Sequence, residues 1–209
     1  MTARVLAFDA SAHRYSVGGA VLPNVSTILK PLWAYSAAIP ADVLANKAAI
    51  GKAAHRAVEL DVEGRLDVRS LHDVVRPYFA AWRAFCAEAH YVSVAAELRV
   101  WHPALNFAGT LDNAGWLDGA AALIDVKCTV DIMPSVGPQT AAYREALAVT
   151  PDVDDALREL AHEARRWCLQ LRPDGTYRML PQDDPNDWRV FLALLTLQNF
   201  KAHHAKHYQ

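Results

Sequence analysis

Cysteine is scarce in this chain of 209 residues, and the three cysteines, Cys86, Cys128 and Cys168, lie about 40 positions apart. An odd number of distant cysteines argues against a disulfide framework, a zinc knuckle and an iron–sulfur cluster. The expected role of all three is that of small hydrophobic side chains in a reducing compartment. No apolar run approaches the ~20 residues of a membrane-spanning helix, and the first residues lack the layout of a signal peptide. We therefore expect a cytoplasmic protein without a membrane partner.

Neither sign of charge dominates the composition. Lysine and arginine number 21 and aspartate and glutamate 23, which gives a net charge of −2. This balance excludes a polybasic arm and a long acidic tail. It does not exclude a nucleic-acid partner, because a cleft can be locally basic on a nearly neutral protein. A chain of this length buries roughly 70% of its unfolded surface, so a single domain can form a core without disulfides or a structural metal.

Residues 1–90 contain patterns typical of short strands followed by helices. Short strands are expected over Val5–Leu22, with Gly18-Gly19 as a turn, and a loop is expected between Pro31 and Pro40. Alanine-rich Ala41–Gly64 and aromatic Ser70–His90 each predict a helix. We thus expect an N-terminal hairpin and loop over residues 1–40 and helices over residues 41–90.

After Tyr91 the apolar period changes from helical to two, which is typical of a strand. Phe107–Leu117 and Ala120–Cys128 predict two further strands, joined by an Asp118-Gly119 hairpin turn. The apolar positions of the first strand are expected to share one face: Val92, Val94, Ala96, Leu98 and Val100.

The rest of the chain predicts a crossover, a hairpin and a last helix. Pro134, Gly137 and Pro138 predict a loop before a helix over Gln139–Val149, Arg165–Leu171 and Thr176–Leu180 predict a hairpin, and Asp187–Lys206 predicts a helix. We expect one α/β domain over residues 1–209, with its core over residues 91–181 and a C-terminal helix within residues 182–209. Its mixed sheet should contain the strands that begin near Val92, Phe107, Ala120 and Arg165.

The Asp118-Gly119 hairpin fixes which residues face each other. A two-residue turn pairs Leu117 with Ala120, so the same register places Asp112 directly opposite Asp125. Opposed residues have Cβ atoms about 4.5–5.5 Å apart, and like charges at that distance repel each other. Lys127 lies two residues beyond Asp125 and shares its face.

Two facing carboxylates beside a lysine are suited to phosphodiester hydrolysis. A hard cation with oxygen ligands, such as Mg²⁺, removes the repulsion and can bind a substrate phosphate. A lysine beside it can orient or deprotonate a water molecule and offset charge in the transition state. The alternative is an exposed hairpin with scattered charges, in which Lys127 pairs with Asp125.

Three motifs, Gly109-x-x-Asp112, Asp125-x-Lys127 and Gln139-x-x-x-Tyr143, resemble in order and spacing those of the PD-(D/E)XK nuclease superfamily. The Gln-x-x-x-Tyr helix is similar to that of its RecB-like branch, which includes phage recombination exonucleases. The segment from Phe8 to Leu29 also resembles the start of phage and bacterial members. The three motifs cover about a quarter of the chain, from Glu97 to Leu147.

This resemblance implies a restriction-endonuclease-like core over residues 91–181 and a metal-dependent DNA exonuclease of phage or bacterial recombination or repair. DNA is then the partner, and a single-strand annealing or recombination protein is a second. The location would be the host cytoplasm if a phage encodes the protein. Leu111 stands where the proline of the superfamily name would be, a frequent departure. The cysteines of the iron–sulfur members are absent, so no such cluster is expected.

The resemblance also implies roles for single residues. Lys127 would be the catalytic lysine, and His55, which matches Gly51-x-x-x-His55, would bind a metal or its water, oriented by Glu59. Glu97 would be a metal ligand, a support for one, or a partner of Arg99. The metal, Mg²⁺ or Mn²⁺, would be held by Asp112, Asp125 and the carbonyl of Val126, and the DNA strand would be contacted by Gln139 and Tyr143.

Other interpretations of these residues remain open. Gln139 and Tyr143 can instead be a helix cap and a half-buried core tyrosine. The protein can be a structure-specific endonuclease, a non-catalytic DNA-binding protein of the same fold, or a small-molecule phosphoesterase. Arg165 and Arg166 are further candidates for phosphate contacts. The oligomeric state is not predicted.

Overall fold

The structure is a computed structural model that describes residues 5–33 and 41–205. Most of the predicted loop between Pro31 and Pro40, and the predicted helical residue Lys206, lie outside these ranges. In the described part of the chain the strands form two sheets. The N-terminal sheet has the order β1-β2-β3 and consists of β1 (Leu6–Asp9), β2 (Arg14–Val17) and β3 (Ala20–Leu22). The prediction of short strands over Val5–Leu22 is confirmed.

The central sheet is mixed and five-stranded, in the order β4-β5-β6-β7-β8. The pair β6–β7 is parallel, whereas the other neighbours are antiparallel. The parallel pair requires a crossover, which contains the helices α4 (Val136–Val149) and α5 (Asp155–Glu163). The strands are β4 (Tyr91–His102), β5 (Phe107–Leu117), β6 (Ala120–Lys127), β7 (Arg165–Leu171) and β8 (Tyr177–Pro181).

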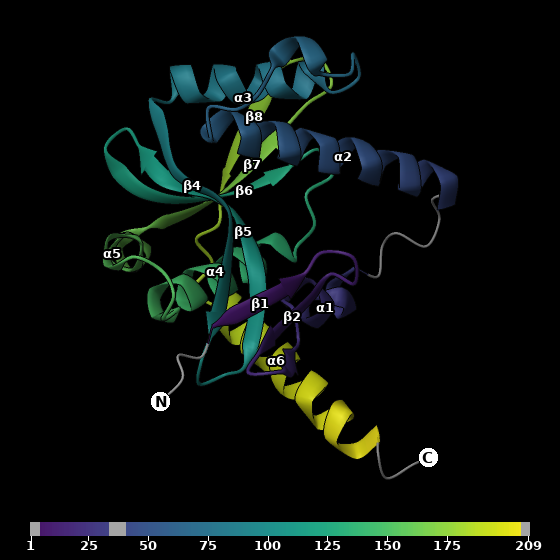
Figure 1. Ribbon diagram of the computed structural model, residues 1–209, viewed down its shortest axis with the longest axis vertical. Helices are drawn as coiled ribbons and strands as arrows, with labels where there is room; N and C mark the ends of the chain where they lie inside the picture. The colour runs from purple at the N-terminus through teal and green to yellow at the C-terminus, as the bar shows by residue number, and fades with distance from the viewer. Residues whose placement is uncertain (1–4, 34–40, 206–209) are drawn as a thin grey trace.

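Helices cover both faces of this sheet (Figure 1). On one face α2 (Ala41–Val62) and α3 (Arg76–Glu88) form a core cluster with β6 residues such as Ile124. On the other face α4, α5 and α6 (Asp187–His204) pack around a cluster that includes Leu123. Successive β6 side chains therefore enter opposite cores, as in a central strand that is covered on both sides. The prediction of an α/β fold with a mixed sheet flanked by helices is confirmed.

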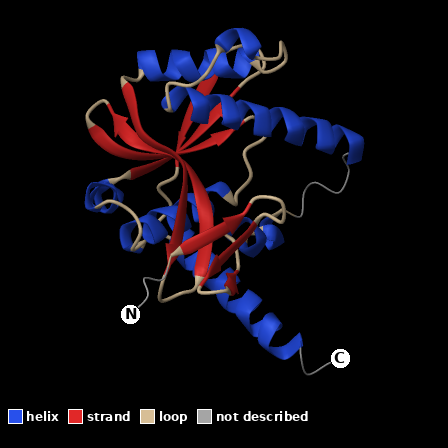
Figure 2. Ribbon diagram, viewed as in Figure 1, coloured by secondary structure: helices blue, strands red, loops and turns tan. Residues whose placement is uncertain are grey.

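Figure 2 shows β4 and β5 as one long pair that continues past the end of β6 and reaches the N-terminal sheet. The segment after β3 is fixed to this extension: Ala108 donates a backbone hydrogen bond of 3.0 Å to the carbonyl of Pro23. Asn24 then caps the short helix α1 (Val25–Ile28), because its side chain accepts a 2.7 Å hydrogen bond from the Thr27 N–H. The N-terminal sheet and α1 are thus held beside β5.

Several predicted boundaries are wrong. The helix expected from Ser70 begins at Arg76, because a 3-10 turn over Val68–Ser70 precedes it. The α4 helix begins at Val136, so Gly137 and Pro138 lie in its first turn, where a proline without an N–H is tolerated. The strand over Tyr177–Pro181 is a fifth member of the sheet. The α5 helix was not predicted, although Asp154 caps it by accepting the Ala156 N–H at 2.8 Å.

The predicted apolar face of β4 is wrong in its first half. Val92 and Val94 are 61% and 45% exposed, while Tyr91 is buried. A β-bulge shifts the register between Ser93 and Ala95, and one extra residue exchanges the two faces of a strand. The alternation of buried and exposed side chains in the C-terminal half of β4 therefore does not continue through the bulge into its N-terminal half.

Arg166 is unsuitable for the phosphate contact considered above. Its side chain is buried, lies 2.9 Å from the Asp187 carboxylate and donates a 2.8 Å hydrogen bond to the carbonyl of Gly137. This arginine therefore joins β7 to the beginnings of α4 and α6. Of the predicted pair, only Arg165 is exposed.

Candidate metal centre and active site

The predicted hairpin register holds up to the candidate site. Leu117 pairs with Ala120, and the same register continues to Asn113 and Ile124. At the next position the strands are joined differently: the Asp112 carboxylate accepts a 2.8 Å hydrogen bond from the Val126 N–H. The regular β5–β6 ladder ends here, and the Asp112 side chain takes the place of a backbone partner. Val126, whose carbonyl was predicted as a metal ligand, contacts Asp112 through its N–H.

On β4, the other neighbour of β5, Glu97 lies opposite Asp112. Ala96 pairs with Asn113 and Leu98 with Leu111, so Glu97 and Asp112 lie between two regular pairs. Glu97 has a φ of +48°, in the left-handed region that non-glycine residues seldom adopt. Such conformations cost roughly 1–3 kcal/mol and are frequent at functional sites. The structure therefore places a locally strained carboxylate beside Asp112.

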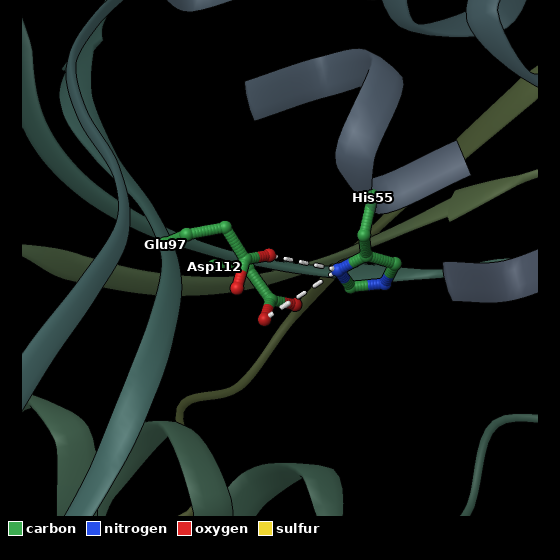
Figure 3. A group of neighbouring side chains, drawn as sticks. All are labelled: His55, Glu97 and Asp112. Atoms are coloured by element: carbon green, nitrogen blue, oxygen red, sulfur yellow. Dashed lines mark hydrogen bonds and ion pairs between the residues drawn. The ribbon is translucent and has the colours of Figure 1, made fainter. Parts of the chain in front are cut away.

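His55 joins these two carboxylates from α2. Its Nδ1 lies 3.3 Å from Glu97 Oε1 and 3.7 Å from Asp112 Oδ1 (Figure 3). The helix is oriented by its buried positions Ala54 and Val58, which pack into the core beside α3. One ligand atom from each residue lies within 4.8 Å of the other two. His55, Glu97 and Asp112 thus form a group that can hold a metal ion.

The pKa values describe the charge of this group without a metal. Burial alone would lower the pKa of His55, but the carboxylates of Asp112 and Glu97 outweigh burial and raise that pKa to about 9. His55 is therefore protonated at neutral pH and acts as the counterion of two carboxylates. A divalent cation would replace this proton with a larger positive charge.

Asp125 and Lys127 form a second group, close enough to Asp112 for the charges to interact. Lys127 Nζ lies 2.6 Å from Asp125 Oδ2; Asp125 is fully buried and the Lys127 side chain is 23% exposed. Burial raises the pKa of Asp125 to about 6, with Asp112 adding to the increase and Lys127 opposing it. Burial alone would lower the pKa of Lys127, but Asp125 and Asp112 outweigh burial and raise it. Lys127 is therefore charged at neutral pH.

Three of the five predicted metal ligands form the cluster, and the two that are not part of it are Asp125 and the carbonyl of Val126. The structure brings together His55, Glu97 and Asp112, whereas Asp125 is oriented toward Lys127. Glu97 contacts His55, while Arg99, its alternative partner, lies over the Phe8 ring at 4.8 Å. Glu59, expected to orient His55, forms an ion pair of 2.5 Å with Arg56.

A cleft of about 390 Å³ lies over the cluster, and Glu97 and Asp112 are part of its lining. One wall is α2, the other is formed by the N-terminal sheet and α1, and α4 contributes Gln139 and Tyr143. The two α4 side chains lie on one helix face, and Gln139 Nε2 donates a 3.4 Å hydrogen bond to Tyr143 Oη. The positions predicted to contact DNA therefore do line the cleft.

Tyr143 is more buried than the half-buried tyrosine considered from the sequence. Only 3% of it is exposed, and its ring belongs to the core cluster around α4. Gly109 makes this possible, since a Cβ there would lie 2.6 Å from Tyr143 Cε1. The ring is thus a structural element, and the hydroxyl, which accepts from the cleft residue Gln139, is the group of Tyr143 to test for a ligand contact.

The DNA contact that the resemblance implies for Tyr143 predicts that Tyr143→Phe reduces DNA binding or cleavage by about ten- to hundredfold, because one hydrogen bond to a charged group contributes about 1.5–3 kcal/mol. The free energy of unfolding should change by less than about 1 kcal/mol, since the ring remains. Tyr143→Ala should instead destabilise the protein by about 3–5 kcal/mol. Urea unfolding and cleavage assays on both variants separate the two effects, and equal cleavage by Tyr143→Phe and the wild type would exclude a role for the hydroxyl.

The sequence interpretation missed several residues of the cleft. His13 and Tyr15 come from the N-terminal strands, and Lys52 and Arg56 from α2. Lys52 lies three positions before His55 on α2, so helical spacing alone could have placed it beside His55, whereas Arg56 is the next residue after His55 and has no such spacing. No comparable local signal exists for His13, because only the tertiary fold brings β1 and β2 to β5.

Neither the comparison with protein-family models nor that with curated proteins gives a match for this chain. Within the described residues no helix has the length and apolar character needed to cross a membrane.

Burial raises the pKa of Cys86, Cys128 and Cys168 to about 12, so these thiols are poor nucleophiles at neutral pH.

Proposed function

We propose that this protein is a divalent-metal-dependent deoxyribonuclease, and specifically an exonuclease with a restriction-endonuclease-like core of the PD-(D/E)XK type. The observation that carries the proposal is the position of the His55–Glu97–Asp112 cluster beside the Asp125–Lys127 pair. The cluster supplies metal ligands, Lys127 supplies a positive charge next to them, and a cleft gives access from solvent to the cluster. The ordered motifs in the sequence point to the same reaction.

The donor set fits a divalent cation. One imidazole nitrogen and two carboxylates suit Mn²⁺ better than Mg²⁺, which prefers oxygen ligands and retains several waters. When bound by His55, Glu97 and Asp112, such a cation would polarise a phosphodiester and lower the pKa of a water molecule. The contact of Glu97 with His55 at 3.3 Å and the Asp112–Val126 hydrogen bond hold the two carboxylates in place without a metal.

Lys127 acts in this proposal as a charged hydrogen-bond donor. Its raised pKa makes it a poor base at neutral pH, which removes water deprotonation from the roles considered for it. An ammonium in a partly desolvated position stabilises the negative charge that develops on the phosphate oxygens. Asp125 keeps the ammonium in place through the 2.6 Å ion pair. Hydrolysis then forms one bond from a water oxygen to phosphorus while one phosphorus–oxygen ester bond breaks, and the leaving alkoxide takes up a proton.

Digestion of end-labelled linear DNA and of covalently closed circular DNA tests this function. With Mn²⁺ or Mg²⁺ we expect linear DNA to be degraded to nucleotides, faster with Mn²⁺, and circles to be resistant, because an exonuclease requires an end. EDTA should stop the reaction. Asp112→Asn is the matched inactive control, since it removes one ligand charge while retaining the shape of the side chain.

Each alternative function has its own outcome in this assay. Circles that are cut as fast as linear DNA would identify an endonuclease. Binding of DNA without cleavage by any divalent metal would identify a non-catalytic DNA-binding protein. Hydrolysis of bis(p-nitrophenyl) phosphate without any cleavage of DNA would favour a small-molecule phosphoesterase.

A single-strand annealing or recombination protein is the partner class that we propose for the exonuclease.

A further inference from the structure

Two donor side chains in the cleft lining, Lys52 and His13, have no hydrogen-bond or ion-pair partner among the described residues. Lys52 is exposed on α2, one turn before Arg56, and His13 is exposed in the turn between β1 and β2. Neither side chain forms a hydrogen bond or an ion pair with any residue in the ranges 5–33 and 41–205. Arg56, by contrast, is paired with Glu59 at 2.5 Å. Within the described residues, Lys52 and His13 are therefore two donors of the cleft lining that are free to bind a ligand.

The two donors come from different walls of the same cleft. Lys52 belongs to α2, which also carries His55, and His13 belongs to the N-terminal sheet beside β5 (Figure 1). Glu97 and Asp112, the carboxylates of the metal cluster, are part of the lining between these walls. A ligand over the cluster therefore lies in a cleft whose lining includes a lysine from α2 and a histidine from the turn between β1 and β2.

His13 is held in place before a ligand binds. Its ring makes edge contacts with Phe8, at 5.4 Å and 87°, and with Tyr15, at 5.8 Å and 78°. The turn that carries it is closed by Asp9, whose Oδ1 accepts the N–H groups of Ser11 and Ala12 at 3.0 and 3.2 Å. Little conformational entropy is then lost when the imidazole donates to a ligand.

We propose that Lys52 and His13 form a two-sided clamp for the backbone phosphates of one DNA strand, on either side of the phosphodiester that lies over His55, Glu97 and Asp112. This inference rests on the proposed function and adds the residues that align the strand. Phosphate groups are the acceptors that lysine and histidine donors bind at successive positions along a nucleic acid. The cleft, about 390 Å³, is near the lower limit of ligand pockets and accommodates a short stretch of one strand.

Lys52→Ala and His13→Ala test the clamp, with Lys47→Ala on α2 and His162→Ala on α5 as matched controls outside the cleft. Each cleft variant should raise the KM for DNA about five- to tenfold and change kcat less than about twofold, because phosphate contacts contribute to substrate and transition-state binding equally. In Lys52→Ala the slope of log(kcat/KM) against log[salt] should become shallower by about 0.7–1, because the lost contact is that of a full positive charge. The controls should match the wild type in both quantities.

Two further measurements separate the clamp from the proposed function. Titration of a fluorescein-labelled oligonucleotide by anisotropy should show the same five- to tenfold loss of affinity in Lys52→Ala and His13→Ala, whether or not cleavage occurs. Mn²⁺ affinity should remain that of the wild type in both, and Lys52→Arg should restore most of the DNA affinity. If either cleft variant keeps the wild-type DNA affinity and salt slope, the clamp is wrong even when the nuclease activity is present. If the wild type binds DNA but cleaves none, the nuclease function is wrong and the anisotropy titration still decides the clamp.

Discussion

Replacing Lys127 with methionine is expected to lower the rate constant of DNA cleavage roughly a thousandfold, the scale found when a preorganised charge-stabilising donor is removed from a partly desolvated site. Lys127 is not a member of the His55–Glu97–Asp112 cluster, so Mn²⁺ affinity should change by only a small factor. Single-turnover cleavage at saturating Mn²⁺, together with calorimetric titration of Mn²⁺, measures the two quantities. Lys201→Met, on the exposed surface of α6, is the matched control.

The same variant has a predictable effect on stability. Asp125 is fully buried, and Lys127 is its ion-pair partner at 2.6 Å. Removing one partner of a buried ion pair lowers the free energy of unfolding by about 3–5 kcal/mol. The loss in Lys127→Met is smaller to the extent that Asp125 takes up a proton and becomes neutral. The double variant Asp125→Asn/Lys127→Met should therefore be more stable than Lys127→Met in urea unfolding at neutral pH, although both are inactive. Wild-type cleavage by Lys127→Met at matched Mn²⁺ would remove this residue from the mechanism.

The hairpin register from Leu117 and Ala120 to Asn113 and Ile124 could be predicted from the sequence because it depends on a local rule, whereas the direct pairing of Asp112 with Asp125 lies beyond the end of that regular ladder. Asp118 and Gly119 have φ values of +47° and +79°, as expected of a two-residue hairpin turn of this type. Such a turn fixes the register, and the register fixes which side chains are neighbours. No information from distant parts of the chain is needed for this step.

The choice of metal ligands could not be predicted in the same way. The sequence favoured Asp125 and left the role of Glu97 open, whereas the structure joins Glu97 to His55 and turns Asp125 toward Lys127. Two non-local features decide this: the left-handed backbone at Glu97 and the end of the β5–β6 ladder at Asp112. Both depend on how three strands and α2 pack together, and no pattern along one strand encodes that packing.

The affinity for Mn²⁺ is expected to rise about tenfold for each pH unit up to about pH 9, where it should level off. His55 faces two carboxylates and its pKa is raised to about 9, so at neutral pH the metal must displace a proton from its ligand. Affinity at pH 7 should then be roughly a hundredfold below that at pH 9, two pH units higher. Isothermal titration in two buffers of different ionisation enthalpy should show close to one proton released per Mn²⁺ at pH 7.

Without a metal, the free energy of unfolding should fall as the pH rises, whereas the affinity for Mn²⁺ rises. His55 has a folded pKa of about 9, above its usual 6.5, so its contribution to stability is complete below pH 6.5 and is lost as the pH rises through 9. Asp125 has a folded pKa of about 6, above its usual 3.8, so stability is also lost as the pH rises from about 4 through 6. In EDTA the free energy of unfolding should therefore decrease across both ranges. The loss between pH 6.5 and 9 should disappear in His55→Gln and persist in the control His162→Gln.

Saturating Mn²⁺ should offset the loss between pH 6.5 and 9, because the cation binds most strongly where the metal-free protein is least stable. Binding adds RT ln(1 + [L]/Kd) to the free energy of unfolding, about 2.7 kcal/mol at a hundredfold excess over Kd. The difference in melting temperature with and without Mn²⁺ should thus widen from pH 6.5 to pH 9 in the wild type and remain small in His55→Gln. If Mn²⁺ affinity did not change between pH 6.5 and 9, His55 would exchange no proton for the metal, and Glu97 and Asp112 would have to bind the cation without it.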